Sequence, residues 1–417
     1  MMLRTKRPAR AGATIAMIAL LSVLTAACTS VEPSSQSALP ISVAGPAASS
    51  SPGAASSASS SAAPVPVARV TASPQLGDDA VTPVEPVTIT VAHGIITALS
   101  VTNPEGAQVV GTMSPDKTSW TLGEPLGYHK TYSVSGTALG SDGLAVPIEG
   151  SYTTVTPVDE ITTSISPGDG AVVGVAAPVI VHLGYEPADK DLIEKHVTIT
   201  TTPHVEGAWA WIQHDGDKWP SLDWRPKVYW PAGTVVHVES NVYGLDFGDG
   251  YFGSANVTSD FTIGRNQVVI ADANAHTIVV QRDGVEVAGY DASFGSGDEI
   301  GDPNRVTRSG IHVVSDMQET VKMSNPAYGY TNVTEHWAVR ISDNGEFIHQ
   351  NQGTVDVQGV DNVSHGCINL SAQSAQAYYE SAIIGDPVEV TGTSVPLSAA
   401  DGDIYDWAIP WETWLQM

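Results

Sequence analysis

The stretch DNVSHGCIN at residues 361–369, with FIH just upstream at residues 347–349, is the most informative part of this chain. It contains Cys367, one of only two cysteines; the other, Cys28, lies near the N-terminus. Proteins of oxidising compartments normally use cysteines in disulfide pairs. A thiol without a partner in the folded part of the chain is therefore a candidate nucleophile, provided that a base lies nearby. Two histidines are candidates for that base. His365 lies two residues before Cys367, and His349 lies 18 residues before it.

The N-terminus has the pattern of an export signal. Four basic residues and no acid fall within the first ten positions, and an apolar stretch follows over residues 11–27. These features define a secretory signal, and a stretch this short favours a signal over a membrane-spanning helix. Because Cys28 directly follows two alanines, the segment resembles a bacterial lipoprotein signal, although Thr25 stands where Leu is commoner. We expect residues 1–27 to be removed and Cys28 to carry a lipid that anchors the exported protein to the outer face of the cytoplasmic membrane. An ordinary signal peptide with an incidental cysteine is the alternative.

The composition of the remaining chain changes near residue 78. Residues 28–77 are mainly Ser, Ala and Pro, which cannot bury enough apolar surface to offset the entropy of ordering, so we predict a flexible tether. The roughly 340 residues that follow exceed what one core normally organises and indicate two or three domains. The net charge of −27 argues against nucleic acid or an anionic surface as a partner.

Residues 78–263 read as two consecutive β-sandwiches. Turn signals recur at intervals of about 8–12 residues between segments of alternating polarity, as at residues 87–91, 132–139 and 151–155. A related pattern recurs further on, so we predict immunoglobulin-like modules at residues 78–157 and 158–263. The second module contains five tryptophans, for which we favour packing in the core over glycan binding: Trp209, Trp211, Trp219, Trp224 and Trp230. Residues 246–250 (DFGDG) lack the ligand spacing of an EF-hand and indicate a turn.

Residues 264–392 are again rich in predicted strands, so the whole chain is expected to be mostly β. Segments 268–270, 276–281 and 285–287 form a predicted meander, and 387–390 returns to strand. One convincing helix is predicted over residues 372–384, directly after the cysteine motif. Ser371 can cap its N-terminus and Gly385 can end it.

The order His, gap, Ser-His-Gly-Cys-x-Asn resembles the signature of the L,D-transpeptidases with a YkuD-type catalytic domain, and residues 264–392 are covered by this resemblance. The resemblance implies that Cys367 is the nucleophile and His349 its proton acceptor. It assigns His365 to shaping the pocket together with Ser364. Because Gly366 permits close approach, its backbone N–H and that of Cys367 are candidate oxyanion donors.

The resemblance also implies where substrate binds. The family orients its histidine through the backbone carbonyl of the next residue, here Gln350, where a serine is frequent in relatives. Asn344 and Gly345 match a Ser-Gly pair that contacts substrate, and Asn369 matches the terminal Asn of the motif. Residues 323–337 resemble the flap over the active site, shorter than in relatives. The residues predicted to contact substrate from this flap are Met323, Tyr330 and, as a competitor of Tyr330, Tyr328.

The implied reaction is acyl transfer in peptidoglycan. Cys367 attacks the diaminopimelate carbonyl of a tetrapeptide stem and releases D-Ala, and an amine of a second stem completes a 3→3 cross-link. Stem peptides and carbapenem inhibitors are the expected partners, with no cofactor and no metal, because the sequence shows no cluster with metal-ligand spacing. Hydrolysis in the same site, as in an L,D-carboxypeptidase, remains open, as does a non-catalytic wall-binding lipoprotein. A papain-like endopeptidase has its cysteine before its histidine, the reverse of this chain.

Residues 393–417 form a tryptophan-rich C-terminal extension that resembles the one of actinobacterial members, specifically mycobacterial lipoproteins with two immunoglobulin-like modules. Trp407, Trp411 and Trp414 are predicted to anchor this extension between domains.

Overall fold

The structure, a computed structural model, describes residues 64–214 and 216–417. The predicted signal, Cys28 and most of the predicted tether lie outside the described residues. Strands dominate and the helices are short, which confirms the mostly β class. Within the described ranges, no helix has the length and apolar character needed to cross a membrane. Three hydrophobic cores follow one another along the chain, so we describe in turn module 1 (residues 64–157), module 2 (158–263), the third domain (264–392) and the C-terminal segment (393–417).

Module 1 consists of two antiparallel sheets, β1-β2-β5-β4 and β3-β6-β7. Alternate side chains of the strands face inward, and Ile89, Trp120 and Tyr152 are buried between the sheets. This is the sandwich that the period-2 pattern predicts. Its strands are β1 (Arg69–Ser73), β2 (Thr88–Ala92), β3 (Gly94–Thr102), β4 (Gly111–Met113), β5 (Ser119–Leu122), β6 (Thr131–Gly140) and β7 (Ala145–Thr153).

The predicted tether extends too far toward the C-terminus. Strand β1 pairs with β2 along its whole length, from Arg69 opposite Ala92 to Ser73 opposite Thr88. Ala68 is buried and Val70 packs against the core of module 1. Small β-formers at alternate positions are therefore enough to complete this sheet edge, although the segment has a tether-like composition.

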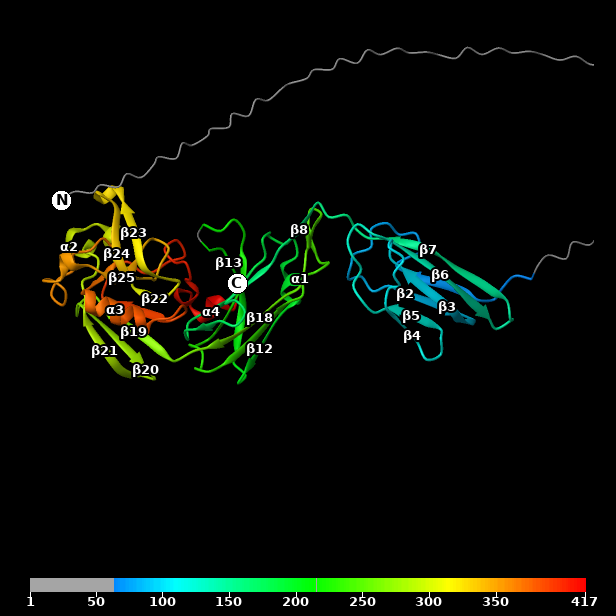
Figure 1. Cartoon of the computed structure of the whole chain (residues 1–417), viewed down its shortest axis with the longest axis horizontal. Coiled ribbons are helices and arrows are strands. Elements are labelled where there is room, and N and C mark those ends of the chain that lie inside the picture. Colours follow the sequence, from blue (N-terminus) through cyan, green and yellow to red (C-terminus); the bar gives the residue numbers. More distant parts are fainter. Residues whose placement is uncertain (1–63, 215) are drawn as a thin grey trace, which may run out of the picture. The chain divides into compact units, whose positions relative to one another are not determined.

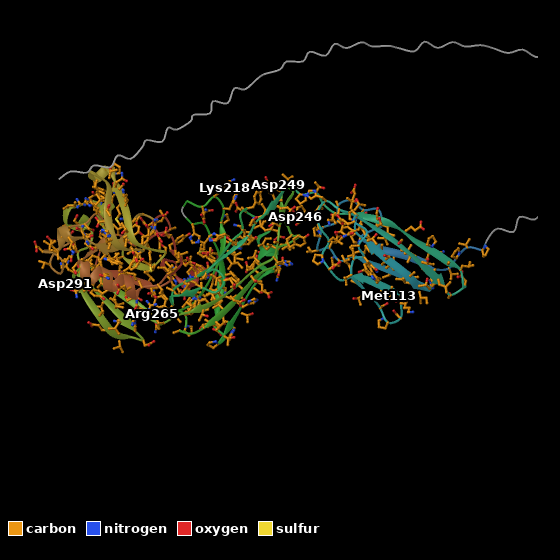
Figure 2. All side chains as sticks on the ribbon, viewed as in Figure 1. Met113, Lys218, Asp246, Asp249, Arg265 and Asp291 are labelled. Atoms are coloured by element: carbon orange, nitrogen blue, oxygen red, sulfur yellow. The ribbon has the colours of Figure 1, made fainter. Side chains whose placement is uncertain are left out.

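Module 2 has two four-stranded sheets, β10-β18-β15-β12 and β13-β14-β11-β9, and a small sheet β16-β17-β8. Trp224 and Trp230 are buried with ring centroids 4.8 Å apart, in agreement with the packing interpretation. Asp246 and Asp249, labelled in Figure 2, belong to the β16–β17 hairpin that the DFGDG stretch forms. The elements are β8 (Asp159–Ile161), β9 (Ser164–Ser166), β10 (Val172–Val173), β11 (Val179–His182), α1 (Lys190–Glu194), β12 (Val197–Thr202), β13 (Gly207–Ile212), β14 (Ser221–Pro226), β15 (Val235–Ser240), β16 (Asp246–Gly248), β17 (Tyr251–Gly253) and β18 (Val257–Ile263).

The third domain contains two sheets, β21-β20-β19-β27-β22 and β23-β24-β25-β26. Figure 1 shows β23 and β24 as a long hairpin (yellow) and α3 in orange; α3 packs against β24 and β25. The elements are β19 (Gln267–Asp272), β20 (Thr277–Arg282), β21 (Val285–Asp291), α2 (Gly297–Ile300), η1 (Pro303–Arg305), β22 (Gly310–Val313), β23 (Asp316–Asn325), η2 (Pro326–Tyr328), β24 (Tyr330–Arg340), β25 (Phe347–Gln350), η3 (Gln352–Thr354), β26 (Ile368–Leu370), α3 (Ala372–Ser381) and β27 (Pro387–Thr391).

Helix α3 begins as predicted and ends three residues early. The Ser371 hydroxyl accepts a hydrogen bond from the Ser374 N–H at 3.2 Å, so the predicted N-cap is confirmed. The helix stops at Ser381, and Gly385 lies in the turn that follows instead of ending it. The buried Asp386 carboxylate accepts the Ile383 N–H at 3.0 Å, which draws the chain out of the helical path.

The C-terminal segment adds η4 (Asp406–Ala408) and α4 (Trp411–Trp414) and packs on module 2. Trp414 is fully buried and its indole N–H donates to the Ala208 carbonyl at 2.9 Å. The Trp407 indole N–H donates to the Ala176 carbonyl at 2.8 Å. The tryptophans therefore anchor the segment, as the sequence predicts.

Candidate active site

Two parallel strands bring the predicted base and nucleophile together. β25 pairs with β26 so that His349 lies opposite Asn369, and Cys367 immediately precedes β26. Both strands are held by buried aliphatic side chains, with Ile348 and Ile368 fully buried. The alternation of each strand then turns His349 away from this core layer and toward the cavity.

The imidazole of His349 is fixed on both sides. Its Nδ1–H donates to the Gln350 carbonyl at 2.7 Å, the contact that the family resemblance implies. The same nitrogen lies 3.4 Å from the Glu335 carboxylate of β24, and the ring lines the same cavity as Cys367. Because Nδ1 is engaged by two acceptors, Nε2 is the nitrogen left for the sulfur.

Glu335 is the functional residue that the sequence analysis missed. Its side chain is only 18% exposed beside the nearly buried His349. Burial acts to lower the pKa of His349, but hydrogen bonds and charge from Cys367 and Glu335 outweigh it and raise the pKa to about 10. Val333 and Glu335, two residues apart on one strand, both line the cavity, so strand alternation across the flap was the available signal.

The predicted oxyanion donors are only partly available. Gly366 adopts a φ of +125°, which favours glycine, and its N–H donates to the Ser364 hydroxyl at 3.0 Å. That N–H is therefore already occupied, and the prediction that it is free to bind an oxyanion is wrong for this structure. The Ser364 hydroxyl in turn donates to the Cys367 carbonyl at 2.5 Å, so it holds the turn around the nucleophile. The Cys367 N–H remains as the candidate donor of the predicted pair.

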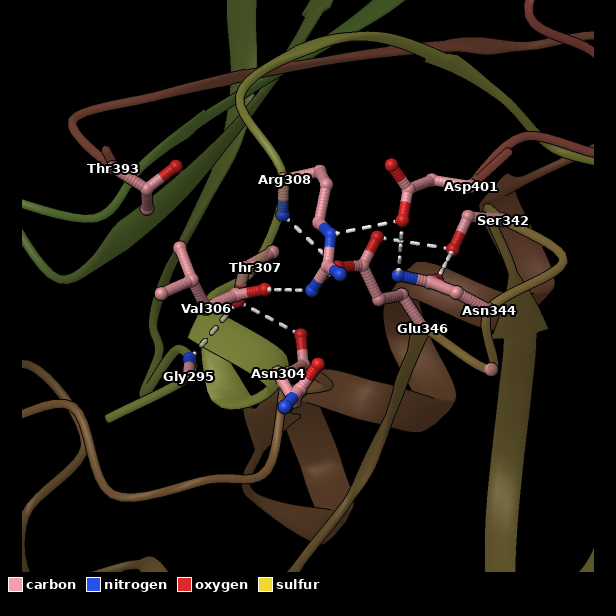
Figure 3. Close-up of polar contacts among 12 residues, drawn as sticks. Gly295, Asn304, Val306, Thr307, Arg308, Ser342, Asn344, Glu346, Thr393 and Asp401 are labelled. Carbon is pink, nitrogen blue, oxygen red and sulfur yellow. Dashed lines mark hydrogen bonds and ion pairs between the residues drawn. The ribbon is translucent and has the colours of Figure 1, made fainter. Parts of the chain in front are cut away.

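A polar network behind the motif supports this turn. The Thr307 hydroxyl donates to the Gly366 carbonyl at 2.7 Å and accepts from the Gly295 N–H at 2.9 Å. Figure 3 shows Thr307 and Gly295 beside Arg308, whose side chain binds Asp401 at 3.1 Å. The C-terminal segment thereby reaches the back of the site.

A cavity of about 370 Å³ opens in front of Cys367. Seven of the predicted site residues line it. The five that do not are Tyr328, Asn344, Gly345, Gln350 and Gly366. The lining side chains belong to Met323, Tyr330, Val333, Glu335, His349, Asn351, Thr354, Val363, Ser364, His365, Cys367 and Asn369.

The structure separates the two tyrosine candidates. Tyr330 lines the cavity, and burial together with the charge of Cys367 raises the pKa of its hydroxyl. The Tyr328 hydroxyl instead donates to Asp302 at 2.8 Å. Both rings pack against His365, with centroids 5.0 and 5.5 Å away for Tyr328 and Tyr330. His365 is thus part of the pocket wall, where burial and the nearby Arg305 lower its pKa.

The other three residues predicted to contact substrate, Asn344, Gly345 and Asn369, differ in their position relative to the cavity. Asn369 is buried and lines the cavity. The Cys367 thiol donates a hydrogen bond to the Gly345 carbonyl at 3.5 Å. The Asn344 side chain points elsewhere, toward Ser342 and Asp401 (Figure 3), and its amide lies 3.4 Å from the Asp401 carboxylate.

The fold and the site together define a mostly β protein with a cysteine–histidine pair suited to acyl transfer. Two family profiles match: the bacterial Ig domain over residues 78–246 and the L,D-transpeptidase catalytic domain (YkuD) over residues 266–390. The chain is 47% identical over 354 residues to L,D-transpeptidase 5 of Mycobacterium tuberculosis (strain ATCC 25618 / H37Rv), covering 85% of this chain and 78% of that one. This chain belongs to the L,D-transpeptidase family.

A further relative agrees with this assignment, and one solved structure is also similar to this chain. L,D-transpeptidase 2 of M. tuberculosis (strain CDC 1551 / Oshkosh) is 36% identical over 356 residues, which is 84% of each chain. A solved structure of LdtMt1 in complex with imipenem has 31% identity and a TM-score of 0.46, covering 57% of this chain and all of the other.

Proposed function

We propose that this protein forms 3→3 peptidoglycan cross-links through an acyl-enzyme on Cys367. The observation that carries the proposal is the buried His349, held by the Gln350 carbonyl and Glu335 and lining the same cavity as Cys367. A thiolate is the reactive form of cysteine, and a charged imidazole beside it favours that form. The raised pKa of His349 keeps its imidazole charged over the neutral range.

In the first half-reaction, the sulfur attacks the carbonyl carbon of diaminopimelate at position 3 of a tetrapeptide stem. The carbon–nitrogen bond to the terminal D-Ala breaks, and the His349 imidazolium gives its proton to the leaving nitrogen. In the second half-reaction, the side-chain amine of another stem attacks the thioester and His349 accepts a proton from that amine. The new amide forms as the sulfur leaves, and Cys367 returns to its starting state.

The decisive experiment is intact-mass analysis of the products from a disaccharide-tetrapeptide. A cross-linked dimer that has lost one D-Ala is the expected product, whereas a tripeptide identifies hydrolysis. Cys367→Ala should abolish both products, and His349→Ala should lower the rate by about 10²-fold or more, the usual scale for a general base. Near-normal turnover in either variant would refute the assignment of these two residues.

A carbapenem should acylate the same sulfur, because the proposed reaction places an acyl group there. Imipenem, the carbapenem in the LdtMt1 complex, is a suitable probe. Mass spectrometry is expected to find one adduct, on the Cys367 peptide. If no carbapenem forms an adduct at high excess, the pocket does not have the proposed chemistry.

We also propose that a lipid on Cys28 anchors the protein to the outer face of the cytoplasmic membrane. The support is the basic N-terminus, the apolar stretch at residues 11–27 and the cysteine that directly follows two alanines. Cys28→Ala should move the protein from the detergent phase to the aqueous phase of a Triton X-114 partition without changing its activity on soluble stems. Unchanged partitioning would exclude the lipid anchor.

A further inference from the structure

Three buried side chains meet where the C-terminal segment packs on module 2. His214 lies just after β13, Asp223 lies on β14 and Asp406 begins η4. Each side chain has one nitrogen or oxygen atom that could bind a metal ion, and these three atoms lie within 4.8 Å of one another. All three side chains are buried. The cluster is remote in sequence from the cysteine motif and has no part in the proposed reaction. Its members are too widely spaced along the chain for the sequence to reveal it.

The imidazole of His214 is oriented toward the two carboxylates. Its Nδ1 lies 3.0 Å from the Asp403 carbonyl, which can only accept, so Nδ1 carries a hydrogen. Its Nε2 lies 2.8 Å from Asp223 Oδ2, and the other Asp223 oxygen accepts the Ser221 hydroxyl at 2.6 Å. A backbone carbonyl that accepts one imidazole N–H fixes the orientation of the other ring nitrogen, as it does in metal-binding histidines.

Asp406 supplies the observation that points to a ligand. Its side chain is 0% exposed, and neither of its carboxylate oxygens has a hydrogen-bond partner among the described residues. A buried carboxylate without a partner is strongly unfavourable unless a proton or a cation compensates it.

Arg225, whose charge acts on Asp406, does not fill this role. The Arg225 guanidinium donates to the Pro226 carbonyl at 3.3 Å and the Ile409 carbonyl at 2.7 Å. It also lies over the rings of Trp407, Trp411 and Trp414, with centroids 4.6 to 5.2 Å away. Its charge acts on Asp406 through space, and the structure gives no hydrogen bond or ion pair between them.

We propose that His214, Asp223 and Asp406 bind one divalent cation of the zinc class. One imidazole nitrogen and two carboxylate oxygens suit zinc, which takes four ligands and accepts both donor types. Calcium takes six to eight oxygens and magnesium retains several waters, which a buried three-residue cluster does not offer. The two charges of the cation neutralise both carboxylates, and the imidazole binds in its neutral form. The proton between Nε2 and Asp223 is released on binding, as is usual for metal ligands.

The proposed role is structural. Asp406 lies between Asp403, which binds Arg340 at 2.9 Å, and the tryptophans that anchor the C-terminal segment. Asp401 in the same segment binds Arg308 behind the cysteine motif (Figure 3). A cation bound by His214 and Asp223 of module 2 and by Asp406 would therefore fix the C-terminal segment, whose Asp401 and Asp403 bind Arg308 and Arg340 of the third domain.

The test uses the full chain with Cys28→Ser and Cys367→Ser, because thiols compete for zinc. Native mass spectrometry is expected to find one zinc per chain, and the melting temperature should rise with zinc and fall with a chelator. Cobalt in place of zinc should give the visible absorption of a tetrahedral site. The proposal is overturned if no stoichiometric zinc is found and the melting temperature changes with neither zinc nor chelator. A proton on Asp406 would then be the compensating charge.

Two variants locate the site. Asp406→Asn should lose the zinc and its thermal effect while matching or exceeding the stability of the metal-free parent, because the amide removes a buried charge. The matched control is Asp260→Asn in an exposed trio that also has one histidine and two acids, where His237 binds Asp260 at 2.8 Å and Glu239 at 3.1 Å. Retention of zinc by Asp406→Asn, or its loss in Asp260→Asn, contradicts the assignment. If Asp406→Asn does not fold, the stoichiometry and thermal response of the parent and of Asp260→Asn decide the question.

Discussion

Replacing Glu335 with glutamine tests whether this acid controls the charge of the catalytic histidine. The substitution preserves the shape of a side chain that is 18% exposed and removes a carboxylate 3.4 Å from His349 Nδ1. The Nδ1–H keeps its hydrogen bond to the Gln350 carbonyl, so the ring should keep its orientation. The variant therefore changes the electrostatics of the base with little change in its geometry.

The magnitude follows from the two partners that raise the pKa of His349 to about 10. An opposite charge within about 4–6 Å shifts a pKa by about 1–3 units, so the pKa of His349 should fall to roughly 7–9 in the variant. A raised pKa keeps the His349 imidazole charged up to a higher pH. If that pKa falls, the ring loses its proton at a lower pH. With a pKa of about 8, the imidazolium population at pH 9 falls about 10-fold relative to the wild type.

The assay is the rate of acylation by imipenem, followed by its absorbance between pH 5 and pH 10. The basic limb of the profile should move to lower pH in Glu335→Gln, with rates near wild type at pH 6. The control is Glu319→Gln, which removes an exposed acid from the neighbouring strand of the same hairpin. A basic limb that stays in place in Glu335→Gln, or moves equally in Glu319→Gln, would refute the assigned role of Glu335.

Three further predictions concern the flap, the turn and the C-terminal anchor. Tyr330→Phe should impair acylation without changing the melting temperature, because it removes the hydroxyl that interacts with Cys367 and keeps the ring; an effect on acylation alone in Tyr328→Phe would transfer the role to Tyr328. Ser364→Ala should slow acylation about 10-fold, as expected for loss of a hydrogen bond of about 1.4 kcal/mol, and an unchanged kcat/KM would contradict this. Trp414→Ala should lower stability by about 3–5 kcal/mol in chemical unfolding, whereas the exposed Leu415→Ala should change it by less than ~0.5 kcal/mol; equal effects would exclude the anchoring role.

Sequence reasoning was most successful where chemistry is local. The cysteine motif placed Cys367, Ser364 and His365 together, and strand alternation located strands of module 1 and the β19–β21 meander of the third domain. Helix α3 was located by its Ser371 cap, but its end was not. That end depends on Asp386, a buried acid that binds Arg265 from the start of the third domain at 2.7 Å, a tertiary contact that local signals cannot carry.

The missed features depend on residues that meet only after folding. Glu335 reaches His349 through the pairing of β24 with β25, which joins Val339 to Ile348. The occupied Gly366 N–H depends on a rotamer of Ser364, which no residue pattern specifies.

The β23–β24 hairpin carries two site residues, Tyr330 and Glu335, at different distances from the point where β24 pairs with β25. Glu335 lies four residues before Val339, where β24 is paired with β25, so its position is fixed close to His349. Tyr330 lies at the far end of the same strand, where β24 pairs only with β23. Movement of the tip therefore displaces Tyr330 more than Glu335. It follows that changes at the tip should alter substrate binding while His349 keeps its raised pKa, and that changes near Val339 should alter both.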